Sequence, residues 1–314
     1  MGSGKTGAAI KHLKRKRFIW ITPRRSLAHN TCHRLDDSFT GTLNYLKLKS
    51  AADKAGKIPN ATKLVIGTQS LHYTRGTYPV VVIDEVEAVM NSWTAVDTHG
   101  GNLEHNFNRF CDLLRGAKQV ILLDALMSNT TLHFLQRLDP DGTTVVLGSK
   151  TPPPPRRMEL LEVPPTKQLR NGGSELQPWL HRIRTDLEAG KRLFIFYPRK
   201  TGTKSMPSIE KLGEWLRNFS KGRVLVYHGD NDEEVNKTLG DVNVSWKDVS
   251  VVLTNSKITV GVNFDAVGFD RGYVCLMDGF TSPRDVIQAS YRVRQFKDNL
   301  VVGTVVRGWR RQIT

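Results

Sequence analysis

The sequence has few cysteines, a deficit of acidic residues and no long apolar run. Its three cysteines, Cys32, Cys111 and Cys275, lie far apart, which argues against a disulfide framework or a zinc site with paired cysteines. Reduced thiols are typical of an intracellular compartment. No segment reaches the length of a transmembrane helix, and the N-terminus lacks the pattern of a secretory signal. We therefore expect an intracellular protein with no membrane partner.

Acidic residues number 30 against 46 lysines and arginines, so the net charge is +16. The basic residues gather at Lys11–Arg17, Arg24–Arg25, Arg156–Arg157 and Arg307–Arg311. A single cluster of this kind can be a solvated face, and we interpret Lys11–Arg17 in that way. A positive excess that recurs along the whole chain attracts polyanions. Because no amphipathic surface helix accompanies the charge, we expect a nucleic-acid partner and not an acidic membrane.

The first six residues form the closing half of a phosphate-binding P-loop, Met1-Gly-Ser-Gly-Lys-Thr6. In such a loop the backbone N–H groups surround the nucleotide phosphates, the lysine reaches the β/γ oxygens and the threonine hydroxyl binds Mg²⁺. The candidates are therefore Gly2, Ser3, Gly4 and Lys5 for ATP, and Thr6 for Mg²⁺. The full pattern needs a further small residue and a strand upstream, which is compatible with Met1 being internal to a longer protein. The alternative is a chance Gly/Ser-rich terminus.

A second motif follows in Val80–Glu87, an apolar run that ends in two carboxylates. This pattern is typical of a buried parallel strand of the Walker B type. Asp84 is then a nucleotide and Mg²⁺ ligand, and Glu85 orients or deprotonates the attacking water. The alternative is a strand that ends at a solvated acidic turn. The P-loop upstream favours the Walker B interpretation.

Two series of alternating strands and helices predict two α/β domains, each a mostly parallel sheet with helices on both faces. We place the first domain at residues 1–149, with strands at 18–21, 64–67, 80–84, 119–124 and 144–147. Residues 150–165 contain consecutive prolines, which favour a stiff linker. The second domain then covers residues 166–314, with strands at 192–197, 224–228, 249–253, 273–277 and 300–306 and helices at 207–219 and 282–295.

The turns that follow several predicted strands carry hydroxyl, amide and guanidinium donors suited to a phosphodiester backbone. The nucleic-acid candidates are Thr22, Arg24, Arg25, Gly67, Thr68 and Gln69 in the first domain and Thr254 and Thr259 in the second. Gly261 allows a close backbone approach to the nucleotide. Taken alone, each turn is also compatible with ordinary helix capping.

The segment Ser282–Arg294 predicts a capped helix that presents polar groups to a nucleotide. Ser282 and Asp285 resemble a capping box. Gln288 and Arg292 are four residues apart and share a face if the helix is regular, in which case Arg294 points elsewhere. An arginine brought to the γ-phosphate from a second domain makes hydrolysis depend on domain closure. The alternative is an arginine-rich surface helix.

With these motifs in order, the chain resembles the core of superfamily 2 helicases. Residues 2–6 and 84–87 resemble motifs I and II of that family, residues 22–27 and 67–70 motifs Ia and Ib, and residues 254–263 and 288–294 motifs V and VI. Within the superfamily it is most similar to viral replication origin-binding helicases, on the Asp84-Glu-Val-Glu87 and Lys257-Ile-Thr-Val-Gly-Val-Asn263 strings and the Arg292-Val-Arg294 ending. Leu123-Asp-Ala125 stands where Ser-Ala-Thr is usual in motif III, and we expect hydroxyls of Ser128, Thr130 and Thr131 to substitute.

The resemblance implies two RecA-like domains with the ATP site in the cleft between them. It further implies an ATP- and Mg²⁺-dependent helicase or translocase in DNA replication, with Lys5, Glu85, Gln288, Arg292 and Arg294 as catalytic residues. Single-stranded DNA is the favoured polymer, other replication proteins are candidate partners, and a viral protein would act in the host nucleus or a viral replication compartment. Two alternatives stay open, a nucleic-acid-binding remnant without unwinding activity and an RNA helicase. Either Arg292 or Arg294 can be the finger.

Overall fold

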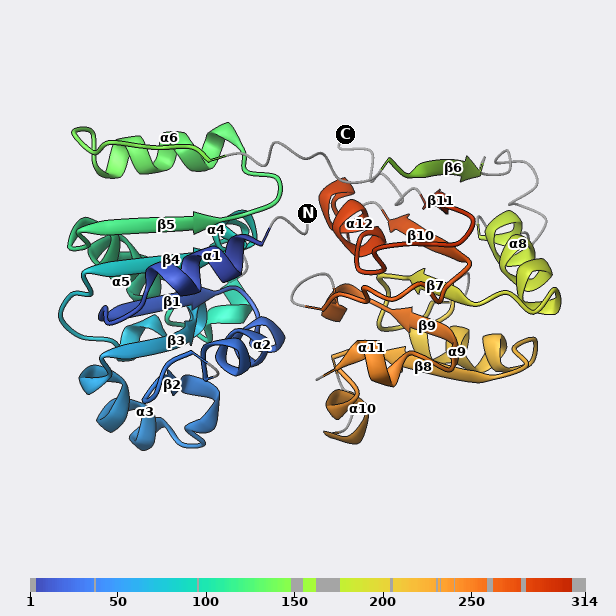
Figure 1. The fold of residues 1–314 in the computed structure, drawn as a ribbon, viewed down its shortest axis with the longest axis horizontal. Coiled ribbons are helices and arrows are strands. Elements are labelled where there is room, and N and C mark those ends of the chain that lie inside the picture. Colours follow the sequence, from blue (N-terminus) through green and yellow to red (C-terminus); the bar gives the residue numbers. More distant parts are fainter. Residues whose placement is uncertain are drawn as a thin grey trace. The chain divides into compact units, whose positions relative to one another are not determined.

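Two all-parallel sheets form the framework of the protein in a computed structural model (Figure 1). One lies in a unit of residues 1–153 and the other in a unit of residues 154–314. The structure describes residues 4–36, 38–94, 96–147, 155–161, 176–203, 206–229, 231, 233–239, 241–258, 262–277 and 281–306. Every helix among them is too short or too polar to cross a bilayer.

The first sheet has the strand order β2-β3-β1-β4-β5. Its strands are β1 (Phe18–Thr22), β2 (Leu43–Asn44), β3 (Lys63–Gly67), β4 (Val80–Asp84) and β5 (Gln119–Leu123). The helices are α1 (Lys5–His12), α2 (Arg25–Asp36), α3 (Ala51–Lys57), α4 (Val86–Ser92), α5 (Leu103–Arg115) and α6 (Asn129–Leu138), with 3₁₀ turns at Tyr45–Lys47, Ile58–Asn60, Thr68–Tyr73 and Val96–His99. Every residue of β1 and β4 is buried, as expected for strands covered on both faces.

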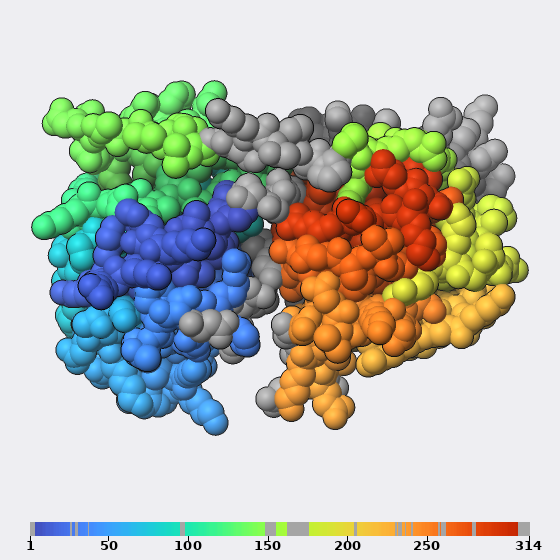
Figure 2. Space-filling view, in the orientation of Figure 1, coloured from blue at the N-terminus to red at the C-terminus, as the bar shows by residue number. Residues whose placement is uncertain are grey.

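Helices cover both faces of this first sheet. In Figure 1, α1 and α2 lie in front of the strands and α5 lies behind them. The space-filling view shows the packed side chains of α1 and α2 over the front of the sheet (Figure 2). The core between these layers includes Trp20, Tyr78 and Phe110, all within a few per cent of full burial.

The second sheet has the order β6-β11-β10-β7-β9-β8. Its strands are β6 (Arg157–Leu161), β7 (Leu193–Phe196), β8 (Arg223–Tyr227), β9 (Val249–Thr254), β10 (Arg271–Met277) and β11 (Leu300–Val306). The helices are α8 (Gln177–Glu188), α9 (Ile209–Arg217), α10 (Glu233–Lys237), α11 (Val242–Ser245) and α12 (Pro283–Ser290), with a 3₁₀ turn at Ser256–Ile258.

Alternate residues of β7 divide the second unit into two apolar cores. Leu193 and Ile195 pack with the residues of α8 and α9. Phe194 and Phe196 belong to the other core, which includes residues of α11 and α12. This alternation is the period of two expected of a strand, and it places helices on both faces. The predicted fold class, two α/β units with parallel sheets, is confirmed.

Two predictions about strand positions are wrong. Residues 144–147 are irregular, not a strand, and Val145, Val146 and Leu147 are 75%, 69% and 90% exposed. A β-branched run favours a strand only where a neighbouring strand can pair with it, and no described strand does so here. Residues 157–161, which we placed in the linker, form β6, because the proline pairs lie outside this run and leave its N–H groups able to bond β11. Most of the remaining linker lies outside the described residues.

Candidate nucleotide and nucleic-acid site

The start of α1 has the geometry of a P-loop terminus. Gly4 precedes the helix with φ 71° and ψ 11°, a left-handed conformation that glycine adopts without steric cost. Lys5 is the first residue of α1 and Thr6 the second, and both are half-buried. The first N–H groups of a helix have no partner within it and attract anions. Gly2 and Ser3 lie outside the described residues.

Asp84 ends β4 at the carboxyl edge of the same sheet and is only 6% exposed. Burial, followed by repulsion from Glu85, raises the pKa of Asp84 to about 7, while the Trp20 indole and the charges of Lys5 and Arg34 lower it. Lys5 and Asp84 therefore share one electrostatic environment. A buried carboxylate of this kind is stabilised in its charged form by a cation, so Asp84 fits the predicted role of Mg²⁺ ligand.

Arg34 is a residue of this environment that the sequence did not reveal. It lies on α2, and its Nη2 atom is 4.0 Å from the position that a Cβ on Gly7 would occupy. Its charge acts on Asp84 in the same direction as that of Lys5. Arg34 belongs to no recognised motif, so only the packing of α2 against the sheet places it near the P-loop helix.

Glu85 joins β4 to α4 in a strained conformation. Its φ of 54° and ψ of 58° lie in the left-handed region, which residues other than glycine rarely occupy. The Glu85 carbonyl accepts bonds from the N–H groups of Ala88 and Val89 at 2.9 and 3.1 Å, which fixes the turn. Strain of this kind costs on the order of 1–3 kcal/mol and is found at functional sites when the surrounding structure holds it in place.

Glu87 connects this turn to the motif III segment. Its Oε1 accepts bonds from the N–H of Ser128 at 2.7 Å and the hydroxyl of Thr131 at 2.6 Å, and its Oε2 accepts from the Ser128 hydroxyl at 3.0 Å. The N–H of Glu87 donates to Asp124 Oδ2 at 3.0 Å. The hydroxyls of Ser128 and Thr131 thus reach a carboxylate of motif II, as the expected substitution requires.

The turns after β1 and β3 lie side by side, because these strands are neighbours in the sheet. Arg25 is exposed at the start of α2, and its charge acts on the buried Tyr45 hydroxyl. Gln69 donates from Nε2 to that hydroxyl at 2.9 Å. A Cβ on Gly67 would lie 2.6 Å from the same oxygen, so a larger residue there would displace Tyr45 and Gln69.

Two other predicted residues of these turns are buried and make hydrogen bonds within the fold. Thr22 is buried, and its hydroxyl donates to the Arg24 carbonyl at 3.4 Å. Thr68 is also buried, and its Oγ1 accepts a bond from the Ser92 hydroxyl at 3.4 Å. Arg24 is half-buried. The exposed donors at this edge are therefore fewer than predicted, with Arg25 the most accessible of the six.

A buried polar network ties the Thr68–Tyr73 turn to the end of α4. The Oδ1 of Asn106, which is fully buried on α5, accepts from the N–H of His72 at 2.8 Å, and its Nδ2 lies 3.3 Å from His99 Nδ1. His99 Nε2 lies 3.2 Å from the Ser92 carbonyl. These partners fix His99 as the tautomer with its proton on Nε2, and burial lowers its pKa.

In the second unit, Thr254 ends β9 and is buried, with its hydroxyl donating to the Asn255 carbonyl at 3.0 Å. Thr259 and Gly261 lie outside the described residues. The predicted capping box at Ser282 and Asp285 is confirmed, and Gln288 is buried on α12.

The prediction that Gln288 and Arg292 share a helix face is wrong. The helix ends at Ser290, because the next backbone groups bond another segment: the Phe264 N–H donates to the Arg292 carbonyl at 2.7 Å, and the Arg294 N–H donates to the Phe264 carbonyl at 2.9 Å. Residues 291–294, which we call the finger segment, leave the helix through a turn, and Val293 pairs with Phe264 in an isolated parallel bridge.

Both arginines of this segment reach the same side chain. Arg292 Nη1 lies 3.3 Å from Asn263 Oδ1, and Arg294 Nη2 donates to that oxygen at 2.9 Å. Arg294 Nε also lies 3.5 Å from the exposed Asp265 carboxylate. Asn263 of motif V therefore holds both arginines of motif VI.

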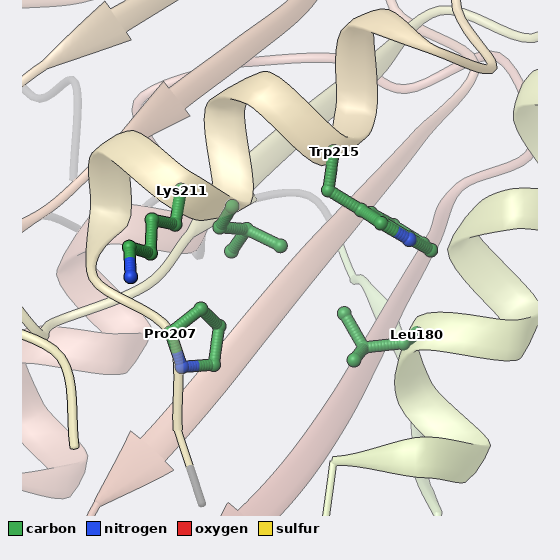
Figure 3. Close-up of a pocket in the computed structure, with 5 residues that line it drawn as sticks. Leu180, Pro207, Lys211 and Trp215 are labelled. Atoms are coloured by element: carbon green, nitrogen blue, oxygen red, sulfur yellow. The ribbon is translucent and has the colours of Figure 1, made fainter. Parts of the chain in front are cut away.

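A groove of about 250 Å³ lies between α8 and α9 (Figure 3). It is lined by Leu180, Pro207, Lys211, Leu212 and Trp215. None of the predicted site residues contributes to it.

Residues 1–150 match the family model described as origin of replication binding protein. The chain is 24% identical, over 95% of its length, to the replication origin-binding protein of human herpesvirus 7 (strain JI). It is 22% identical, again over 95% of its length, to a protein of Acanthamoeba polyphaga mimivirus named "Uncharacterized putative helicase R8". The predicted resemblance is confirmed. The chain spans 36% of the herpesvirus protein and 28% of the mimivirus protein, so it corresponds to about a third of each.

Solved helicase structures share the fold. The T. fusca Cas3–ATP structure superposes with a TM-score of 0.63 at 15% identity, over 99% of this chain and 44% of that one. Mycobacterium smegmatis Lhr bound to single-stranded DNA and AMP-PNP gives 0.60 at 17% identity, over 96% and 42%. S. cerevisiae Dbp5 bound to RNA and ADP BeF3 gives 0.60 at 16% identity, over 97% and 77%. At these identities the comparison establishes the RecA-like fold of the two units.

Proposed function

We propose that this chain is the ATP-driven motor core of a viral-type replication helicase. The observation that carries the proposal is the convergence of Lys5, Asp84 and Glu85 at the carboxyl edge of one parallel sheet. Lys5 begins a helix behind a left-handed glycine, Asp84 is buried within reach of the lysine's charge, and Glu85 is held in a strained turn beside it. In open α/β sheets, ligands bind at this edge.

The residues present fit ATP with Mg²⁺. Gly4 and the N-terminus of α1 would receive the phosphates together with Lys5, and Thr6 and Asp84 would hold the metal. Bound ATP supplies the phosphoanhydride whose hydrolysis drives movement. Glu85 would accept a proton from the attacking water, and Arg292 or Arg294 would stabilise the charge that develops on the phosphoryl oxygens.

The nucleic-acid surface would include the turns after β1 and β3. Arg25 offers an exposed guanidinium there, and the net charge of +16 supports a polyanionic partner. Thr254, Thr259 and Gly261 are the proposed counterparts in the second unit. We favour single-stranded DNA because the chain's relatives include herpesvirus and mimivirus proteins named for replication origins or as a helicase. Other replication proteins, and a site of action in the host nucleus or a viral replication compartment, are part of the same proposal.

Two alternatives are tested against this proposal. A nucleic-acid-binding remnant would bind polymer without hydrolysing ATP, and an RNA helicase is compatible with the fold because one structural neighbour holds RNA and another single-stranded DNA. Steady-state ATPase measured with single-stranded DNA, with RNA and without polymer separates the three. We expect stimulation by DNA above RNA. Turnover absent in every condition would favour the remnant, and stronger stimulation by RNA would favour the RNA helicase.

The matched controls for this experiment lie on one helix. Lys5→Ala should abolish turnover while leaving polymer binding largely intact, because the P-loop lysine contacts ATP phosphates. Lys11→Ala removes an exposed lysine of α1 and should leave turnover unchanged. Equal rates in the parent and Lys5→Ala would contradict the P-loop assignment.

A further inference from the structure

The side chain of Arg156 lies against the finger segment, which is far from it in sequence. Its guanidinium donates to the carbonyls of Ser290, Val293 and Arg294, the last two at 2.9 Å. It also lies over the rings of Tyr291 and Phe296, with its Cζ 4.4 and 4.8 Å from their centroids. All these partners lie within residues 290–296.

These contacts suit a planar, permanently charged group. Arginine carries five N–H donors in a fixed fork and stacks on aromatic faces, which lysine cannot reproduce. The Ser290 carbonyl ends α12, where the helix dipole favours a cation. Removal of the guanidinium would leave three backbone acceptors without this donor in a half-buried site, which is costlier than the loss of an exposed bond.

The finger segment is thus held from two sides. On one side Phe264 bonds the backbone of Arg292 and Arg294, and Asn263 holds both side chains. On the other side Arg156 bonds the carbonyls of Ser290, Val293 and Arg294. The backbone bonds at Phe264 use the Arg292 carbonyl and the Arg294 N–H. The carbonyls of Val293 and Arg294 accept their bonds from Arg156 instead.

We propose that Arg156 is a positioning residue that holds the finger arginines in the orientation needed for ATP hydrolysis. The proposal rests on the proposed function of this chain as an ATP-driven motor. Arg156 itself touches no reacting atom. It acts through the backbone of residues 290–294, at the point where the chain enters the second unit.

The adjacent Arg157 provides a matched control. Its backbone N–H donates to the Asn299 carbonyl at 3.1 Å, and its side chain is exposed. Arg157→Ala therefore removes the same charge one residue away without touching the finger segment. Arg156→Lys keeps the charge, but its single nitrogen replaces the two that bond the Ser290 carbonyl and the Val293 and Arg294 carbonyls separately, and it has no planar group to stack on the rings.

The first measurement needs no enzymatic activity. Trypsin cleaves after arginine, so the release of peptides that end at Arg292 and Arg294 reports how firmly the finger segment is held. We expect Arg156→Ala to be cut at these two sites at least about tenfold faster than the parent, since local opening governs cleavage. Arg156→Lys should be intermediate and Arg157→Ala unchanged. Parental cleavage rates in a folded Arg156→Ala protein would show that Arg156 does not hold the segment. If Arg156→Ala does not fold, parental cleavage rates in Arg156→Lys would show the same.

The second measurement is the DNA-stimulated ATPase of the same proteins. We expect kcat of Arg156→Ala to fall at least about tenfold, with KM for ATP changed less than about twofold, because a misplaced finger weakens the transition state more than the ground state. A loosened segment with normal kcat would overturn the positioning role. If the parent itself lacks ATPase activity, the proposed function fails and the catalytic part of this inference with it, while the trypsin result still decides whether Arg156 holds the segment.

Discussion

Glu85 combines an unusual backbone with an adjacent buried carboxylate. The positive φ at this position means that a truncating substitution would change the strain of the turn as well as the chemistry of the side chain. Glu85→Gln keeps length and shape and replaces the basic carboxylate with a neutral amide. We expect ATP to bind but hydrolysis to slow at least about a hundredfold, the range attributed to a general base.

The measurement for Glu85→Gln is a single turnover with labelled ATP retained on the protein. Glu104→Gln, an exposed position on α5, serves as the control and should turn over at the parental rate. Parental hydrolysis by Glu85→Gln would mean that another group activates the water.

His99 is expected to make the first unit sensitive to acid. Its Nδ1 faces the Asn106 amide nitrogen, so a proton there would bring two donors together. Burial lowers the pKa of folded His99, whereas an unfolded histidine titrates near about 6.5. As pH falls below that value the unfolded state binds a proton that the folded state does not, so the free energy of unfolding decreases. The decrease stops once the pH is low enough for folded His99 to bind its proton too.

Denaturant midpoints at pH 7.5 and 5.5 test this expectation, with unfolding followed through Trp93, which stacks on His99 with centroids 5.0 Å apart. Between these two pH values the midpoint should fall less in His99→Gln than in the parent. In free energy of unfolding, the difference should be at most about 1.4 kcal/mol per pH unit. His105→Gln, exposed on α5, should behave as the parent does. An identical pH dependence in His99→Gln would exclude His99 as the titrating group.

At the scale of single elements, the early end of α12 changes what is expected of the finger arginines. On a regular helix Arg292 would face the nucleotide and Arg294 would not. Beyond the end of the helix both arginines bind Asn263 Oδ1, so we expect Arg292→Ala and Arg294→Ala each to lower stimulated turnover at least about tenfold. Asn263→Ala should also lower it, because it releases both side chains.

Stimulated ATPase and binding of a fluorescent ATP analogue distinguish the outcomes. Binding should change little in all three variants. A loss confined to Arg292→Ala would single it out as the finger, and unchanged turnover in all three would argue that the second unit contributes no arginine to the site.

The sequence was informative where a local rule was sufficient. The buried run Val80–Asp84 and the Ser282 capping box follow from hydrophobicity and side-chain chemistry within a few residues, and both were predicted with nearly correct bounds. The end of α12 depends on Phe264, and the fate of residues 144–147 depends on whether a strand lies beside them. Arg34 and Arg156 were missed for the same reason, since their partners are distant in sequence.

At the scale of the whole molecule, the distributed positive charge predicts salt-sensitive binding. Affinity for single strands should fall with a logarithmic slope of about 0.7 per neutralised phosphate and vary little between mixed sequences of equal length. Arg25→Ala should weaken binding to all of them alike. Fluorescence anisotropy at several salt concentrations measures both effects.

Arg115 supplies the control for Arg25. It is the last residue of α5, and the chain then enters β5 at its amino end. Arg115 therefore lies at the amino edge of the sheet, whereas the predicted motifs lie at the carboxyl edge. Arg115→Ala removes the same charge and should change affinity much less. Equal losses in the two variants would point to a general field effect, and a loss with only some sequences would argue for base recognition.

The pairing of β6 with β11 sets the order in which the protein can be built. All five strands of the first sheet are complete by Leu123, whereas β6, at the start of the second unit, finds its partner only in Leu300–Val306. The backbone acceptors of Arg156 are also made late, at residues 290–294. During synthesis the first unit can therefore fold while the second still lacks an edge of its sheet, and closing that long loop is a slow step. A nascent chain that stops before Leu300 would leave β6 without its partner strand, and it would be exposed to chaperones and proteases until β11 is made.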